Sequence, residues 1–189
     1  MPLSTDSLAT LILRVYTQHM KKTMNGFTIV ELLIVIIVIA ILTAVSIVAY
    51  SGIQTRAENN KTIAATNQTL KLLTLYKEIN GTYPNSGIKY ACIGYGYQSD
   101  VCFSSPSFGT TAEVNATFNT ALQSVGTLPN GSTKNLTMDN GNIVAGLSFE
   151  TGNKMIRYHL EGANQSCGIN GSTGPYTYGT VTQCRIVLP

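Results

Sequence analysis

The sequence predicts an α+β fold, in which a long amino-terminal helix, hydrophobic in its first half and amphipathic in its second, packs on a small antiparallel β-sheet head. Three observations predict it: an apolar run over residues 27–50, a helix-forming continuation over 51–80, and a change after Pro84 to residues typical of turns and short strands. With 189 residues, the chain has room for one ordinary domain and an appendage.

The apolar run carries the main compositional signal. Charged residues make up 11% of the chain and hydrophobic residues 44%, whereas a soluble domain has roughly 25% charged residues. Within the 24 residues from Phe27 to Tyr50 the single charge is Glu31. A helix of this length reaches across about 30 Å of hydrocarbon. The segment is therefore expected to meet a membrane.

The charge distribution predicts which end stays inside the cell. Residues 1–26 hold Arg14, Lys21 and Lys22 against Asp6, and the remainder is nearly neutral. A basic flank keeps that end in the cytoplasm, so the carboxyl-terminal part is expected outside. The net charge of +3 predicts no direct nucleic-acid site. Met20 begins a more compact basic segment than Met1 does, and a start there would make residues 1–19 an extension of the gene model.

The helix is expected to continue through residues 51–80, which contain one glycine, Gly52, and no proline. Asn80-Gly81 followed by Tyr83-Pro84 should end it. The apolar residues of its later turns share one arc of the helical wheel, opposite an arc of polar ones. The first arc holds Leu72, Leu73, Leu75, Tyr76 and Ile79, and the second holds Lys71, Thr74, Lys77 and Glu78.

Residues 81–189 form the predicted head. Asn85–Thr117 is expected to be an irregular loop region that holds the first cysteine pair. Thr151-Gly152-Asn153 can form a tight hairpin turn between two strands. Four short antiparallel strands are expected to pack one face on the helix. They are Ile143–Glu150, Lys154–Leu160, Val181–Leu188 and, more weakly, Lys134–Met138.

All four cysteines lie on the predicted outer side, where an even number favours disulfides. Three connectivities are possible, and the spacing favours two local pairs, Cys92 with Cys102 and Cys167 with Cys184. A zinc site is the competing interpretation. It is disfavoured because the chain has no CxxC spacing and neither histidine is near a cysteine in sequence.

No catalytic set is recognisable, and we expect neither an enzyme nor a cofactor or metal. His159 is expected to be structural. Asp139 with Asn140 and Asn142 could suggest calcium, but an ordinary turn is favoured. Eight Asn-x-Ser/Thr sequons exceed chance and mark either glycosylation or a head rich in Asn and Thr. They begin at Asn60, Asn67, Asn80, Asn115, Asn130, Asn135, Asn164 and Asn170.

The junction before the apolar run admits three interpretations. A secretory signal would have a shorter apolar run followed by a cleavage site. A plain membrane anchor explains the length but not Glu31, because an acidic side chain costs about 2.5 to 3.5 kcal/mol at a helix centre. The third treats an ionisable group inside such a segment as functional, with a partner to be identified.

Gly26-Phe27, with Glu31 four residues later and Lys21-Lys22 before it, resembles the class III signal of type IV prepilins and related pseudopilins. The resemblance covers residues 20–50, and the pilin-like architecture extends it to the rest. It implies that a prepilin peptidase cuts between Gly26 and Phe27 and methylates the new amine of Phe27. It also implies that Glu31 pairs with the amino-terminal ammonium of a neighbouring subunit.

The resemblance divides the chain into a leader (1–26), a transmembrane and filament-core helix (27–50), its amphipathic continuation (51–80) and an extracellular head (81–189). The disulfide-bounded loop 167–184 would lie on the filament surface. Its tyrosines, Tyr176 and Tyr178, would either touch other surfaces or pack on the loop's own sheet, and packing is favoured. The chain departs from many bacterial pilins at Ala40 and Val48, where those have a glycine and a proline that let the helix unwind.

The expected function is that of a structural subunit of a type IV pilus, in adhesion, motility or DNA uptake. Expected partners are other copies of the chain, minor pilins, the prepilin peptidase, an inner-membrane platform protein and an assembly ATPase. The precursor would cross the cytoplasmic membrane once, and the assembled subunit would lie in a surface pilus. The alternatives are a pseudopilin of a type II secretion or competence system and a single-pass surface-anchored binding protein, with a secreted enzyme least favoured.

Overall fold

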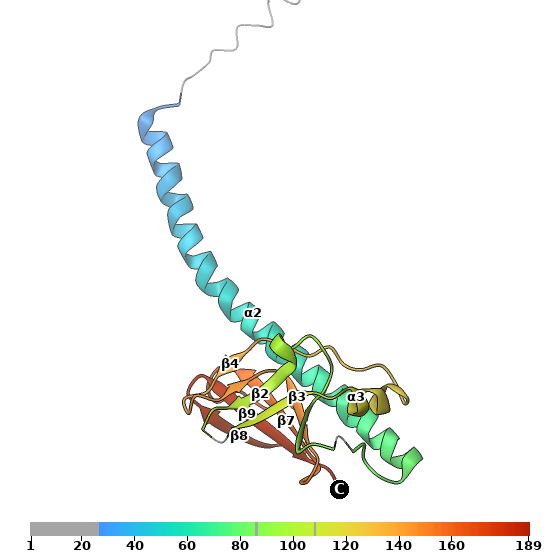
Figure 1. The fold of residues 1–189 in the computed structure, drawn as a ribbon. Helices are drawn as coiled ribbons and strands as arrows, with labels where there is room; N and C mark the ends of the chain where they lie inside the picture. The colour runs from blue at the N-terminus through green and yellow to red at the C-terminus, as the bar shows by residue number, and fades with distance from the viewer. Residues whose placement is uncertain (1–26, 86, 108) are drawn as a thin grey trace, which may run out of the picture. The chain divides into compact units, whose positions relative to one another are not determined.

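The computed structural model describes residues 27–85, 87–107 and 109–189, apart from the side chains of residues 47–49. The chain divides into two units, Met1–Ile47 and Val48–Pro189. Helix α2 contributes to both (Figure 1). In chain order the elements are α2 (Ile29–Asn80), β1 (Tyr90–Cys92), the 3-10 turn η1 (Gln98–Asp100), β2 (Val101–Ser105), β3 (Thr110–Val114), α3 (Ala116–Gln123), β4 (Leu136–Thr137), β5 (Ile143–Val144), β6 (Leu147–Glu150), β7 (Met155–Glu161), β8 (Thr173–Tyr178) and β9 (Val181–Val187).

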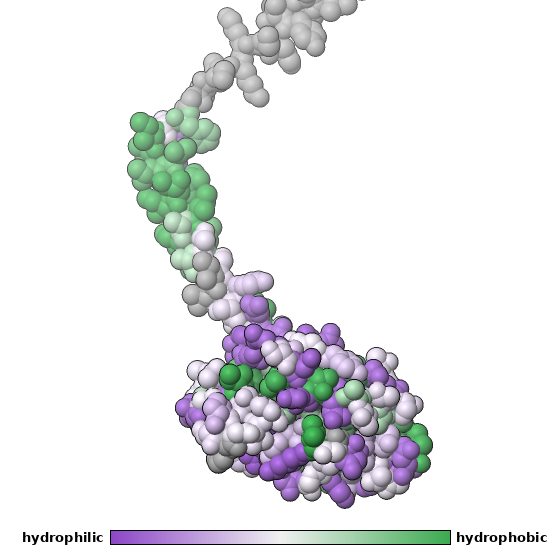
Figure 2. Space-filling view, in the orientation of Figure 1, coloured by the Kyte–Doolittle hydropathy of each residue, from purple (hydrophilic) through white to green (hydrophobic). Residues whose placement is uncertain are grey.

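The first part of α2 has no packing partner within its own unit. Every described side chain from residue 29 to residue 46 is exposed, and Figure 2 shows them as one apolar stretch. By length and composition α2 can cross a membrane, and it is the only helix in the described ranges that can. The apolar helix predicted from the sequence is therefore confirmed.

The later part of α2 packs through a stripe of small and polar residues. Its buried positions recur every three or four residues, as one helix face requires. They are Asn59, Thr62, Ala65, Thr66, Thr69, Leu72 and Leu73. The hydroxyl of Thr66 donates to the carbonyl of Thr62 over 2.8 Å, so that hydroxyl can be buried without penalty.

The helical wheel is wrong at two residues of the predicted apolar arc. Leu75 and Ile79 are 41% and 65% exposed. The buried stripe continues from Leu73 toward Tyr76, which is half-buried. Leu75 and Ile79 lie outside this stripe. The helix ends at Asn80, where the amide of Gly81 donates to the carbonyl of Lys77 over 2.8 Å. This end agrees with the predicted one.

The head is a nine-stranded sheet in the order β4-β5-β2-β3-β1-β6-β7-β9-β8. The pairings are antiparallel except for β1 with β3. The prediction of four strands was too low, because β1, β2 and β3 lie in the segment taken for a loop and β8 lies in the terminal cysteine loop. These strands are short and rich in small or polar residues, so they lack the apolar alternation that marks a strand. The predicted strand Ile143–Glu150 is divided into β5 and β6.

One face of the sheet packs on the later part of α2 and on α3, which lies beside it (Figure 1). Residue Asn115 caps α3, because its side chain accepts a hydrogen bond of 2.8 Å from the amide of Phe118. The core between helices and sheet is formed by fully buried side chains, of which the largest are Tyr158, Phe118, Phe149, Leu73 and Ile93.

The opposite face of the sheet is concave. Val144 of β5 and Val181 of β9 belong to one buried cluster with Met138, although five strands separate β5 from β9 in the sheet. The sheet must therefore curl until its ends meet. The concave face encloses polar residues of the central strands, including His159, Gln183 and Glu150, which are all buried.

Gly146 lies between β5 and β6 in a closely packed environment, and a substitution there tests this packing. It has a φ of +52°, and a Cβ there would lie 2.5 Å from the carbonyl oxygen of Ser132 and 2.9 Å from the ring of Tyr97. Gly141 has a φ of +76° with open space around it. We expect Gly141→Ala to lose about 1 kcal/mol of unfolding free energy from backbone strain, and Gly146→Ala to lose at least about 2 kcal/mol more. Denaturation of the detergent-purified variants, followed by circular dichroism, measures both. Equal losses would contradict the packing.

Candidate functional site

The start of α2 brings Phe27, Thr28 and Glu31 together. Phe27 precedes the helix and is 81% exposed. Thr28 caps the first turn, since its hydroxyl oxygen accepts a hydrogen bond of 3.2 Å from the amide of Glu31. The Oε2 atom of Glu31 in turn accepts hydrogen bonds of 2.8 Å from both the amide and the hydroxyl of Thr28. This reciprocal arrangement is a capping box, which stabilises the beginning of a helix.

The sequence reasoning missed this local role of Glu31. Threonine followed three residues later by glutamate, just before an apolar run, is the signal that could have revealed it. The capping box uses only one carboxylate oxygen. Within the described residues, Oε1 of Glu31 accepts no hydrogen bond. A cation from outside the chain can therefore bind there without disrupting the helix start.

The charge of Glu31 is isolated among apolar side chains. From Ile29 to Ser46 the helix offers no other ionisable group. The positive end of the helix dipole favours a carboxylate in the first turn. In a membrane or a bundle of apolar helices, the Glu31 carboxylate would still lack a counterion. An unpaired charge in such surroundings costs free energy.

The apolar segment satisfies its own hydroxyl groups. Thr43 donates to the carbonyl of Ile39 and Ser46 to that of Leu42, each over 2.7 Å. Neither of these two hydroxyl groups therefore needs water or an additional partner. The helix is continuous through Ala40, as expected from the absence of glycine and proline there.

Gly26 lies outside the described residues, so cleavage beside it and methylation of Phe27 stay predictions.

The structure pairs Cys92 with Cys102 and Cys167 with Cys184, which leaves no cysteine for the zinc alternative. The loop between the second pair contains strand β8, which pairs with β9. Tyr178, half-buried, packs on the cluster of Met138, Val144 and Val181. Tyr176 is 40% exposed, and the guanidinium of Arg185 lies 4.5 Å from its ring centroid.

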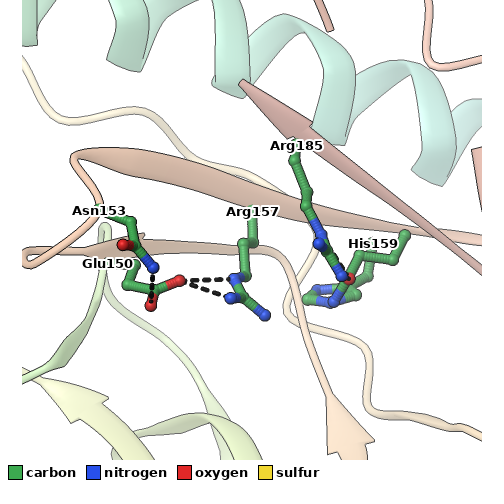
Figure 3. A network of polar contacts seen from close by, with 6 residues as sticks. Glu150, Asn153, Arg157, His159 and Arg185 are labelled. Carbon is green, nitrogen blue, oxygen red and sulfur yellow. Dashed lines mark hydrogen bonds and ion pairs between the residues drawn. The ribbon is translucent and has the colours of Figure 1, made fainter. Parts of the chain in front are cut away.

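A polar network occupies the concave face (Figure 3). Arg157 forms an ion pair with Glu150, which also accepts a hydrogen bond of 2.6 Å from Asn153. The guanidinium of Arg185 donates to Oε1 of Gln183 at 2.7 and 3.0 Å. Within the described chain, no carboxylate lies within 4.0 Å of Arg185.

The network fixes the protonation of His159. A guanidinium can only donate, so the oxygen of Gln183 must face Arg185 and its amide nitrogen must face His159. That nitrogen lies 3.1 Å from Nε2 of the histidine, which therefore accepts. The imidazole is neutral, with its proton on Nδ1. Burial, followed by the positive charge of Arg157 and to a lesser extent that of Arg185, lowers the pKa of His159 to about 3. His159 is thus structural, as expected.

This histidine makes the stability of the head depend on pH. Its pKa rises from about 3 in the folded chain to 6.5 when unfolded, so protons favour the unfolded chain below pH 6.5. Its contribution is complete above pH 6.5 and falls by at most about 1.4 kcal/mol per pH unit as the pH drops toward 3. Denaturation at pH 7 and pH 5 should show a smaller difference for His159→Gln than for the wild type. The same difference in both proteins would refute this role.

The segment around Asp139 is an ordinary turn. The amide of Asn142 donates to the side chain of Asn140 over 3.1 Å, and the amide of Gly141 donates to the carbonyl of Met138 over 3.0 Å. No group of three or more His, Cys, Asp or Glu side chains that could hold a metal occurs in the ranges that the structure describes. The turn interpretation of the sequence therefore agrees with the structure.

A long apolar helix that begins at a capping-box glutamate and leads into a mostly antiparallel sheet is the α+β arrangement of pilin-like proteins. Residues 21–47 match the family model of the prokaryotic N-terminal methylation motif, the class III signal peptide of type IV pilins. This match covers the start of the chain only, where the chain is similar to type IV pilins and pseudopilins, and it supports a pilin-like structural protein. Searches of curated proteins and of solved structures gave no match.

Proposed function

We propose that the chain is a structural subunit of a type IV pilus that polymerises through its amino-terminal helix. The observation that carries this proposal is the carboxylate of Glu31, which lies at the start of an exposed apolar helix inside the methylation motif and, within the described residues, leaves Oε1 without a hydrogen bond. A membrane anchor needs no such charge, whereas a polymer of apolar helices can use it to choose its register.

The chemistry of assembly begins at the junction. A prepilin peptidase hydrolyses the peptide bond between Gly26 and Phe27, which leaves a carboxylate on Gly26 and an ammonium on Phe27. The enzyme then transfers a methyl group from a methyl-donor cosubstrate to that nitrogen, which gives up a proton. The ammonium of Phe27 in one subunit pairs with Glu31 of its neighbour. In low-dielectric surroundings an unpaired carboxylate is penalised by several kcal/mol, and the neighbour's cation removes the penalty. Only one stagger of the two helices brings these charges together, so the pairing also selects against other registers.

The remaining segments have separate tasks. Residues 27–50 anchor the precursor in the cytoplasmic membrane and later form the filament core. Residues 51–80 continue the helix into the head, and residues 81–189 are displayed outside the cell. The energy for extraction from the membrane comes from an assembly ATPase acting through a platform protein, and minor pilins join the filament.

A pseudopilin of a secretion or competence system has the same amino-terminal chemistry. The Cys167–Cys184 disulfide at the carboxyl end, together with the ordinary turn at Asp139, favours a pilin over pseudopilins that use calcium there. Electron microscopy of cells with a label on the head separates the two. Labelled filaments that extend from the cell surface support a pilus. Label confined to short structures within the envelope supports a pseudopilus.

Mass analysis of the mature protein tests the processing step. We expect a chain that begins at Phe27 and carries one methyl group on its amine, because the peptidase removes the leader and keeps the apolar helix. Intact mass and amino-terminal sequencing of protein from the membrane and from filaments measure this. A mature chain that begins at Met1 or Met20, or that lacks the apolar helix, would exclude the proposal and leave a surface-anchored or secreted protein.

A further inference from the structure

We propose that the concave face of the sheet binds an acidic sugar unit, a hexuronic acid, beside β1, β3 and β2. A pocket of about 280 Å³ lies there, lined by Lys89, Tyr90, Phe103, Ser105 and Thr110. The proposal does not rest on polymerisation, since all of these residues belong to the second unit.

The strand register builds the pocket. Phe103 and Ser105 of β2 lie opposite Ala112 and Thr110 of β3, so these side chains share one face of the sheet. Because Ala112 is small, the rings of Tyr90 on β1 and Phe103 on β2 meet across β3. Their centroids are 5.8 Å apart and the ring planes are tilted by 46°. The two rings form an apolar wall for a ligand.

A buried hydroxyl group in the wall lacks a partner. Ser105 is 2% exposed, and its Oγ atom has no hydrogen-bond partner within the described residues. A buried polar group without a partner is uncommon and costs free energy. Ser105 lines the pocket, and a ligand hydroxyl group that reaches its Oγ atom, which the free protein shields from solvent, would supply the missing hydrogen bond.

The pocket also carries an unpaired positive charge. The ammonium of Lys89 lies 5.1 Å from the ring centroid of Tyr90, and no carboxylate of the described chain lies within 4.0 Å of it. Arg157 lies 5.5 Å from the same centroid, but its charge is neutralised by Glu150. One net positive charge therefore borders the aromatic wall, and it favours an anionic ligand.

These three features together define the ligand. A sugar ring can pack its C–H face on Tyr90 and Phe103, donate a hydroxyl to Ser105, and place a carboxylate near Lys89. A neutral sugar would leave the lysine unused, and an inorganic anion would leave the aromatic wall unused. The volume is near the lower limit of small-molecule sites, which begin at about 300 Å³, so one sugar ring fits and a longer chain would extend into solvent.

The test compares two ligands that differ in charge and in one methyl group, methyl galacturonoside and its carboxyl methyl ester. Dissociation constants are measured by ligand-observed saturation-transfer NMR with the full-length protein in detergent. We expect the acid to bind more tightly than the ester, and the preference to shrink as salt is added. Lys89→Gln should weaken binding of the acid about tenfold and leave the ester unchanged, because a charge-assisted contact is lost.

Two further variants complete the test. Lys71→Gln removes another exposed lysine, on α2, and should change neither constant. Ser105→Ala should weaken both ligands several-fold while the fold stays intact, since the lost hydroxyl has no partner within the described chain. The proposal is overturned if the wild type binds neither ligand, if acid and ester bind equally, or if Lys89→Gln and Lys71→Gln behave alike.

Discussion

Replacing Glu31 by alanine is expected to abolish filament assembly and to leave the precursor in the membrane. The apolar helix that inserts is unchanged, and the substitution makes it more apolar. The neighbour's ammonium would then be buried without a counterion, at a cost of several kcal/mol for every subunit added. Electron microscopy of sheared surface material measures filaments, and membrane fractionation measures insertion.

The capping box complicates that substitution, because alanine also removes the hydrogen bonds to Thr28. Glutamine separates the two roles. A glutamine side chain can maintain the capping box but carries no charge. If charge pairing governs assembly, Glu31→Gln should fail to assemble as completely as Glu31→Ala. If the helix start governs it, Glu31→Gln should assemble normally and Thr28→Val should fail.

Glu78→Ala is the matched control, because it removes an exposed carboxylate from the same helix outside the apolar segment. It should assemble as the wild type does. Normal filaments from Glu31→Ala, with a membrane content equal to that of the wild type, would rule out the assembly role of this carboxylate.

Removing the Cys167–Cys184 disulfide is expected to destabilise the head by about 3 kcal/mol. The bond closes a loop with a sequence separation of 17, and both cysteines are buried in the core between sheet and helices. The carbonyl of Cys167 also accepts a hydrogen bond of 2.8 Å from the hydroxyl of Tyr158, at the centre of that core. The loss is a large share of the roughly 5 to 15 kcal/mol that holds a domain folded.

The double variant Cys167→Ala, Cys184→Ala should therefore melt well below the wild type in circular dichroism. The matched control is Cys92→Ala, Cys102→Ala, which opens a shorter loop with a sequence separation of 10. We expect a smaller loss there, because the entropy gained by the unfolded chain grows with loop length. A control that melts at the lower temperature of the two would contradict this ranking.

The helix was predictable because its signals are local. The apolar run and the Gly81 end are both readable from neighbouring residues, and both agree with the structure. The packing stripe was not readable, because Thr62, Thr66 and Thr69 count as polar in any hydrophobicity pattern. Their burial depends on the sheet that covers them and, for Thr66, on a hydrogen bond to the helix backbone.

The sheet shows the same limit more strongly. Strand β7 has the apolar alternation of a half-buried strand and was predicted. Strands β3 and β8, with sequences Thr-Thr-Ala-Glu-Val and Thr-Gly-Pro-Tyr-Thr-Tyr, are held by pairing with neighbours that are distant in sequence or follow a turn. The concave pocket was unpredictable for that reason, because Tyr90 and Phe103 meet only after β3 lies between them.

The candidate assembly site was predicted as a set of residues, without the local geometry around Glu31. The roles of Gly26, Phe27 and Glu31 are implied by the resemblance, which rests on their spacing in a linear signal, and these roles stay predictions. The Thr28-to-Glu31 spacing could have indicated the capping box, but the coordinates were needed to show that Oε2 takes both hydrogen bonds and that Oε1 takes none within the described residues.

The pairing itself can be measured as a distance. Filaments are co-assembled from two populations of the chain, one with ¹³C-labelled glutamate and the other with ¹⁵N-labelled phenylalanine, and examined by solid-state NMR. We expect magnetisation transfer between the Glu31 carboxylate and the Phe27 amine nitrogen at about 4 Å, the separation of an ion pair. In such filaments this transfer can only occur between subunits. If it is absent there and present only when a single subunit carries both labels, Glu31 pairs within its own chain and does not set the register of the polymer.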